Sequence, residues 1–178
     1  MKKILVLILL VMTSMAGRAQ MLALKTNALM DVAMVPNLGL EIATGNRTSL
    51  AANGFASWNI YGMRAKTYGF IPEFRYWLSG NTFSKLFLGA GATLAHYDLT
   101  SGNTSYYGSA YGAGLNVGYD CWLSRHFSVE FHAGVGMYYY HHARTGAGDI
   151  LPENPPYNDQ GWTVLPYNIG ISFVYIIK

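Results

Sequence analysis

The stretch FSVEFHAGVGMYY, residues 127–139, decides the fold class, because its side chains alternate between two chemical kinds. The odd-numbered positions are apolar: Phe127, Val129, Phe131, Ala133, Val135, Met137 and Tyr139. The even-numbered positions are small, polar or Tyr: Ser128, Glu130, His132, Gly134, Gly136 and Tyr138. A period of two is that of a β-strand, whose successive side chains point to opposite faces. The stretch is therefore predicted to be a strand with one apolar face.

The same period recurs in seven further stretches, some shorter or less regular. They are Leu22–Met30, Leu38–Ala43, Thr48–Asn59, Tyr68–Leu78, Leu86–His96, Tyr111–Cys121 and Leu165–Tyr175. In the last of them the apolar face comprises Leu165, Tyr167, Ile169, Ile171, Phe173 and Tyr175. The chain has 20 glycines, many of them inside these stretches. Helices are disfavoured, because each Gly costs about 1 kcal/mol relative to Ala in a helix.

The links between these strands are alternately short and long. Residues 45–47, 79–83 and 124–126 form short turns, and the longer loops are Asn59–Lys66, Asp98–Tyr106 and His141–Gly161. The link at 35–37 is a short exception. An even number of strands with this alternation is typical of bacterial outer-membrane barrels. The sequence predicts an all-β, eight-stranded antiparallel up-and-down transmembrane β-barrel.

Aromatic residues gather near the strand ends, as in the girdles that flank a membrane barrel. They include Trp58, Tyr76, Trp77, Tyr106, Tyr107, Trp122, Tyr138, Tyr139, Tyr140 and Trp162. A soluble secreted β-sandwich or a lipocalin-like barrel would show the same alternation with its apolar face inward. The polar faces favour the membrane barrel, because they are rich in small residues and poor in charge, which suits a narrow lumen.

The N-terminus has the layout of a secretory signal peptide. Two lysines precede the apolar run Ile4–Met12, and Gly17 and Ala19 suit cleavage after Ala19. The run is too short to span a bilayer as a helix, although an N-terminal anchor helix is the alternative. We expect a signal peptide at 1–19 and an outer-membrane barrel domain at 20–178.

Composition restricts the classes of function. Charged residues make up 12% of the chain, against about a quarter in a typical soluble domain. Without residues 1–19, which hold three of the 12 Lys and Arg, nine remain against nine acidic residues, so no basic patch indicates nucleic acid. Cys121 is the only cysteine, which excludes an internal disulfide and disfavours a Cys-based metal site.

Several charged or titratable residues fall on the face opposite the apolar one and are expected to line the lumen. They are Lys25, Asp31, Glu41, Glu73, Arg75, Asp120, Glu130 and His132. Because an unpaired buried charge is costly, they are expected to pair in a salt-bridge network that fills the barrel. A gated ion path or an acid–base pair is the alternative use of the same residues.

Other motifs are weaker. His126, Ser128 and Glu130 resemble the His-x-Ser and Glu set of outer-membrane lipid A deacylases, but His126 falls in a turn expected to face the periplasm. His141 and His142 open the longest loop, where exposed loop residues are favoured over metal ligands. No catalytic residue, cofactor site or metal site is predicted.

Ordered motifs along the chain resemble one family. They are Leu24-Lys25-Thr26-Asn27, Pro36 to Glu41, Pro72 to Leu78, Tyr111 to Gly114, Leu123 to His126 and Gly170 to Lys178. This set resembles the Domain of Unknown Function 3575 family of outer-membrane barrels from Bacteroides-type bacteria, similar in build to small OmpA-like barrels. The resemblance implies an outer-membrane location and a link to fimbrial or cell-surface assembly, and it implies no catalytic residues.

The sequence therefore favours a non-enzymatic outer-membrane protein with a structural or surface-interaction role. Its expected partners are outer-membrane lipid, lipopolysaccharide and a surface or periplasmic protein that contacts the loops 59–66, 98–106 and 141–161. A narrow porin-like channel and a lipid A-modifying enzyme are the alternatives.

Overall fold

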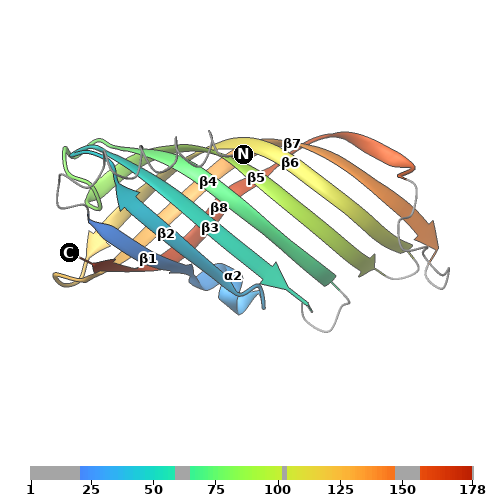
Figure 1. The fold of residues 1–178 in the computed structure, drawn as a ribbon, viewed down its shortest axis with the longest axis horizontal. Coiled ribbons are helices and arrows are strands. Elements are labelled where there is room, and N and C mark those ends of the chain that lie inside the picture. Colours follow the sequence, from blue (N-terminus) through green and yellow to red (C-terminus); the bar gives the residue numbers. More distant parts are fainter. Residues whose placement is uncertain (1–20, 59–64, 102–103, 147–156, 178) are drawn as a thin grey trace, which may run out of the picture.

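The computed structural model describes residues 21–58, 65–101, 104–146 and 157–177, which form a closed barrel (Figure 1). Eight antiparallel strands follow one another around the wall in sequence order, and β8 closes the ring by pairing with β1. The predicted all-β up-and-down topology is confirmed. The strands are β1 (Leu22–Asn27), β2 (Asn37–Ala43), β3 (Thr48–Ser57), β4 (Ala65–Trp77), β5 (Lys85–Ser101), β6 (Thr104–Trp122), β7 (Phe127–Gly146) and β8 (Asp159–Ile177).

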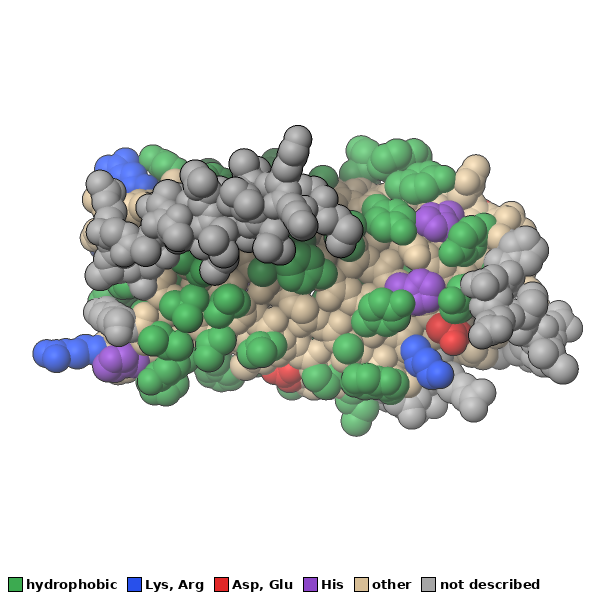
Figure 2. All heavy atoms as spheres, viewed as in Figure 1, with side chains coloured by type: hydrophobic (Ala, Val, Ile, Leu, Met, Phe, Trp, Pro, Cys, Tyr) green, Lys and Arg blue, Asp and Glu red, His purple; other side chains and the backbone are tan. Residues whose placement is uncertain are grey.

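The apolar faces of the strands form the outer wall. Leu115 of β6 is 66% exposed, whereas its neighbour Asn116, which points to the opposite face, is 5% exposed. Figure 2 shows hydrophobic side chains over the visible middle of the wall and Lys and Arg side chains near its ends. This distribution is the reverse of that in a water-soluble domain, where charged residues are almost never fully buried.

Outward-facing aromatic residues line up across neighbouring strands. Tyr111, Tyr139 and Trp162 are in register on β6, β7 and β8, and the rings of Tyr139 and Trp162 lie 5.3 Å apart between centroids. Two residues predicted for such a girdle, Trp77 and Tyr138, are instead buried inside the barrel. Both occupy inward positions of the two-residue period, which outweighs their place near a strand end.

The first predicted strand, Leu22–Met30, is wrong beyond Asn27. The Asn27 side chain accepts a hydrogen bond from the Leu29 N–H at 3.0 Å and caps the short helix α2 (Ala28–Val32). Asn is a favoured N-cap because its side-chain oxygen satisfies a free N–H of the first turn. The link between β1 and β2 is accordingly longer than predicted. Among the described residues, no helix is long and apolar enough to cross a membrane.

The strands lengthen steadily around the ring, from six residues in β1 to 20 in β7. Since the turns 44–47, 78–84 and 123–126 gather at one end, the extra length projects at the other (Figure 1). We call this part the outer extension: Ala95–Ser101, Thr104–Ala110, Tyr140–Gly146 and Asp159–Gly161.

Two of the predicted loops are wrong in part, because strands of the outer extension continue into them. β5 and β6 extend into Asp98–Tyr106 and pair there as far as Ser101 and Thr104, and β7 and β8 extend into His141–Gly161. Polar strands of this kind lack the apolar alternation by which strands were recognised. Residues 59–64 and 147–156, which make up most of the rest of the predicted loops, lie outside the described residues.

A β-bulge changes the inward set of β8. The register with β7 shifts between His132 and Gly134, opposite Asn168, whose φ is +46°. The extra residue turns Tyr167 into the barrel, where its side chain is fully buried. The prediction that Tyr167 faces outward is therefore wrong, because the extra residue of the bulge changes the face to which Tyr167 points.

Candidate functional site

Five of the residues predicted to line the lumen meet in one cluster, which we call the charged layer. It comprises Lys25 of β1, Glu41 of β2, Glu73 and Arg75 of β4, and Glu130 of β7. None of these side chains is more than 4% exposed. Because β2, β4 and β7 lie at separate positions around the ring, the layer crosses the interior from wall to wall.

Arg75 is the centre of the charged layer. Its Nη1 atom lies 3.0 Å from Glu41 Oε2 and 2.8 Å from Glu130 Oε2, and its Nε donates to Glu73. Hydrogen bonds between ionised partners are about twice as strong as neutral ones. One guanidinium thus joins carboxylates from three strands.

Lys25 supplies the second cation. Its Nζ lies 2.5 Å from Glu130 Oε2 and also pairs with Glu41, so both carboxylates are shared with Arg75. Glu41 also accepts a hydrogen bond of 2.5 Å from Ser49 Oγ, which accepts one of 2.9 Å from Trp77 Nε1. The Glu41 carboxylate is therefore also held by a hydrogen bond from β3, as burial of an ion requires.

The Glu73 carboxylate accepts hydrogen bonds from two side-chain amides. Asn116 of β6 and Asn168 of β8 each donate to Glu73 Oε2 at 3.0 Å. The inner face of β5 leaves room for this contact, since a Cβ added to Gly89 would overlap the Asn116 side chain and lie 3.0 Å from Glu73 Oε1. A glycine is needed here because the facing side chains occupy the space.

The other three predicted lumen residues lie apart from the charged layer. Asp120 is buried and accepts a hydrogen bond of 2.8 Å from Ser128, and His132 is buried with Nε2 3.0 Å from Ser172 Oγ. Asp31 is exposed on α2, and its prediction as a lumen residue is wrong because the strand ends at Asn27. The two-residue period could not place a residue that is in a helix.

An apolar cluster, the turn-end plug, closes the barrel beside the charged layer. It consists of Ala23, Ala43, Trp77, Phe83, Phe87, Val174 and Ile176. Phe83 belongs to the turn between β4 and β5 and reaches full burial with φ of +57°, a conformation uncommon for a bulky residue. The Arg75 guanidinium lies 4.5 Å from the Phe87 ring centroid, in range for a cation–π contact.

The other side of the charged layer is also filled. Ile71, Tyr138 and Tyr167 form a second cluster, against which Phe55 packs. A cavity of about 20 Å³ lies beside Arg75, Asn168 and Ser172, with room for about one water molecule. The interior thus has three consecutive filled layers, which are the turn-end plug, the charged layer and this aromatic cluster.

The residues that resemble a deacylase set do not converge. Ser128 donates to Asp120, and Glu130 is held by Lys25 and Arg75. His126 is exposed in the turn before β7, with its ring 6.2 Å from that of Tyr175. A serine nucleophile needs an adjacent base, and these residues form no such pair.

The two adjacent histidines lie on β7 rather than in a loop, which corrects their prediction as exposed loop residues. His142 is 8% exposed, its Nδ1 lies 3.0 Å from Tyr97 Oη, and its Nε2 lies 3.4 Å from Asp159. His141 stacks on Tyr111. In the part of the chain that the structure describes, no three His, Cys, Asp or Glu residues are grouped as metal ligands would be.

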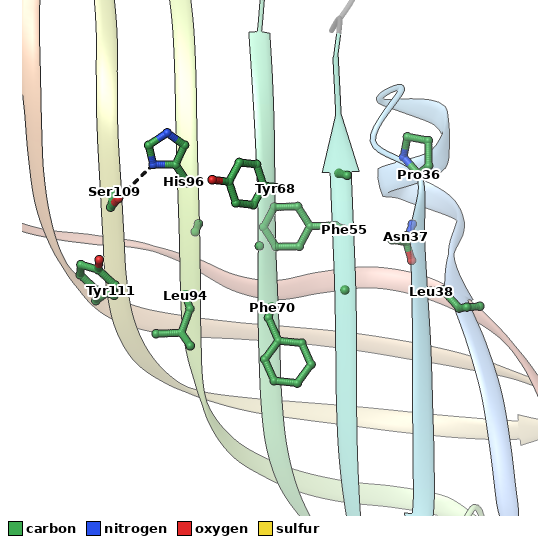
Figure 3. A pocket seen from close by; sticks show the side chains of 14 residues that line it. Pro36, Asn37, Leu38, Phe55, Tyr68, Phe70, Leu94, His96, Ser109 and Tyr111 are labelled. Carbon is green, nitrogen blue, oxygen red and sulfur yellow. Dashed lines mark hydrogen bonds between the residues drawn. The ribbon is translucent and has the colours of Figure 1, made fainter. Parts of the chain in front are cut away.

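A groove of about 960 Å³ lies on the outer wall across β2 to β6 (Figure 3). Its apolar residues include Leu38, Phe70 and Leu94, and at one end His96 Nδ1 lies 3.1 Å from Ser109 Oγ. Strand β3 contributes only Gly54 and Ala56 to the outward face there. This groove and the charged layer are the two candidate sites.

Comparison with protein families identifies one match. A family model described as "Protein of unknown function (DUF3575)" matches residues 4–177. The chain belongs to this family. Searches among curated proteins and among solved structures returned no match. The DUF3575 match confirms the predicted family and assigns no activity, so a function must be argued from the geometry.

Sequence reasoning missed three features of this DUF3575 barrel. Tyr167 and Asn168 reach the interior because of a bulge. The two-residue period of the sequence does not indicate this bulge. The insertion of Phe83 could have been suspected from an aromatic residue inside a short turn. The outer groove could have been suspected from the run Ala52-Asn53-Gly54-Phe55-Ala56, which has only small residues at its even positions.

Proposed function

We propose that the mature chain spans the bacterial outer membrane as a closed, non-enzymatic barrel that has a structural or surface-interaction role. In this proposal residues 1–19 are a signal peptide removed after Ala19, and the outer extension faces the cell exterior. The observation that carries the proposal is the inverted distribution of side chains, with charges inside and apolar residues outside.

The height of the apolar wall supports a bilayer as its surroundings. On β6 the outward residues from Tyr111 to Cys121 are apolar or aromatic, and such a span has the length of the about 9–11 residues that a tilted membrane strand needs. Beyond Tyr111 the outward positions include Ser109 and Tyr107. A closed barrel also satisfies the backbone polar groups of its paired strands, as hydrocarbon requires.

The filled interior supports a closed barrel rather than the alternative of a narrow channel. Ions would have to pass the charged layer and the turn-end plug, and both occupy the lumen with buried side chains. We expect no resolvable conductance when the purified barrel is added to planar bilayers. Stable single-channel openings would favour the channel.

The outer extension supports a role in contact with a surface partner. Seven residues of β6 beyond the apolar wall, at about 3.4 Å each, extend about 24 Å along the strand. The expected partners are outer-membrane lipid, lipopolysaccharide and a surface or periplasmic protein, and the family resemblance adds a link to fimbrial or cell-surface assembly. The balance of acidic and basic residues gives no support for nucleic acid.

Cell fractionation combined with heat-modifiable gel mobility tests the proposal. We expect the processed chain in the outer-membrane fraction, with faster migration before boiling than after it. Recovery in the soluble fraction without detergent would contradict the proposal, because the apolar wall would then face water.

A further inference from the structure

We propose that the outer-wall groove holds an acyl chain of a zwitterionic phospholipid, with the head group at the end marked by His96 and Ser109. This inference rests on the proposed membrane location and orientation, which place the head group in the outer leaflet. It adds a specific site for phospholipid among the lipopolysaccharide expected there. A volume of about 960 Å³ is at the upper end of the about 300–1,000 Å³ usual for ligand sites.

The groove exists because the outward face of β3 has no large side chain at Ala52, Gly54 and Ala56. A Cβ added to Gly54 would meet no atom within 4 Å, so the floor is open at this position. Leu38 on one side and Tyr68 and Phe70 on the other are large and between 45% and 64% exposed. The result is an apolar trough, in which an acyl chain would bury more surface than on a flat wall.

One end of the groove is polar. His96 and Ser109 share a hydrogen bond of 3.1 Å, and the Tyr68 ring lies 5.2 Å from that of His96 (Figure 3). One outward position further along, Lys66 and Asp98 face each other in the register of β4 and β5. The groove therefore changes from apolar to hydrogen-bonding along its length, as a phospholipid does.

The charges at the polar end favour a zwitterionic head group. Within the described residues neither Lys66 nor Asp98 forms an ion pair, so one cation and one anion are available side by side. A phosphoethanolamine group offers a phosphate for Lys66 and an ammonium for Asp98. The several phosphates of lipid A would instead need a cluster of Lys or Arg.

The polar end is assigned to binding rather than to hydrolysis. A serine nucleophile needs a base that is itself oriented by a third group. Among the described residues, no carboxylate forms a hydrogen bond or ion pair with His96. The retained lipid is therefore expected to be intact.

Native mass spectrometry of the full barrel tests the inference. The protein is reconstituted in vesicles of equal parts phosphatidylethanolamine and phosphatidylglycerol, floated, and released in mild detergent. We expect wild type to retain phosphatidylethanolamine, Gly54→Leu to retain about tenfold less, and Lys66→Glu to lose the preference for it. Ala133→Leu is the matched control, because Ala133 is outward and exposed on β7, outside the groove.

The outcomes separate the two proposals. If wild type fails to float with vesicles, the membrane location is wrong. If wild type floats but retains no lipid, or if Gly54→Leu retains as much as Ala133→Leu, the groove inference alone is overturned. A preference for phosphatidylglycerol, or for lipid A added in a parallel sample, would overturn the head-group assignment, and a lysolipid product would contradict the binding role.

Discussion

The turn end of the barrel and the outer extension share strands β5 to β8 but satisfy their polar groups differently. At the turn end, each charge of Lys25, Arg75 and Glu130 is met by a buried partner from another strand. In the outer extension, His142 relies on a phenol and a carboxylate, and Asp159 is 46% exposed. Bulk water can replace a lost partner only in the second region.

This difference indicates in which region the fold tolerates substitutions. A partner removed from a sealed interior leaves a charge with no compensation, whereas one removed near water leaves a group that can be solvated. The comparison predicts large losses of stability at the turn end and small ones in the outer extension. Four substitutions test it in order of expected size.

The largest effect is expected for Arg75→Ala. Three carboxylates would lose their shared cation, so the free energy of unfolding should fall by about 3–5 kcal/mol. Urea unfolding of the barrel in vesicles, followed by gel mobility, measures the loss. Arg47→Ala is the control, because Arg47 is exposed in a turn and makes a 3.4 Å contact with Tyr76. Equal stabilities would show that the charged layer is not needed.

Phe83→Ala should follow, at about 3 kcal/mol. The change leaves a cavity in the turn-end plug, and Phe-to-Ala changes in cores cost about 3–5 kcal/mol. The same unfolding assay applies, with Leu123→Ala in the neighbouring turn, 70% exposed, as the control. If Phe83→Ala unfolds at the wild-type midpoint, the turn-end plug does not contribute to the stability of the barrel.

Gly89→Ala is expected to cost about 2 kcal/mol, because the added Cβ overlaps Asn116 and crowds Glu73. Gly54→Ala is a matched control on the outer face, where the same group meets open space. Both variants add one methyl group to a strand of the wall, Gly89→Ala on the inner face of β5 and Gly54→Ala on the outer face of β3. Similar losses in both would contradict the described packing of the interior.

The smallest effect is expected for Tyr97→Phe in the outer extension. It removes the hydrogen bond to His142, worth about 1 kcal/mol, from a region that water reaches. Hydrogen exchange should quicken at the ends of β5 and β7, while the global unfolding midpoint stays within error of wild type. A drop as large as that of Arg75→Ala would remove the contrast between the two regions.

Much of the wall could be predicted from the sequence, since the two-residue period of Phe127–Tyr139 and Tyr111–Cys121 places each side chain on a face. That period also brought Lys25, Glu41, Glu73, Arg75 and Glu130 inside. The period does not predict which charged side chains contact one another, because contacts across the lumen depend on the stagger of the strands. It failed for Asp31, where a helix begins, and for Tyr167, where a bulge shifts the register.

The most direct test of the account is the environment of the outward face of β6. Nitroxide labels are attached at Leu115→Cys and Tyr107→Cys in a Cys121→Ala background, and the barrel is placed in vesicles. The account predicts that the Leu115 label meets oxygen but not a water-soluble nickel relaxant, while the Tyr107 label meets the nickel compound. Equal access of the nickel compound to both labels would contradict the claim that the apolar wall lies in hydrocarbon.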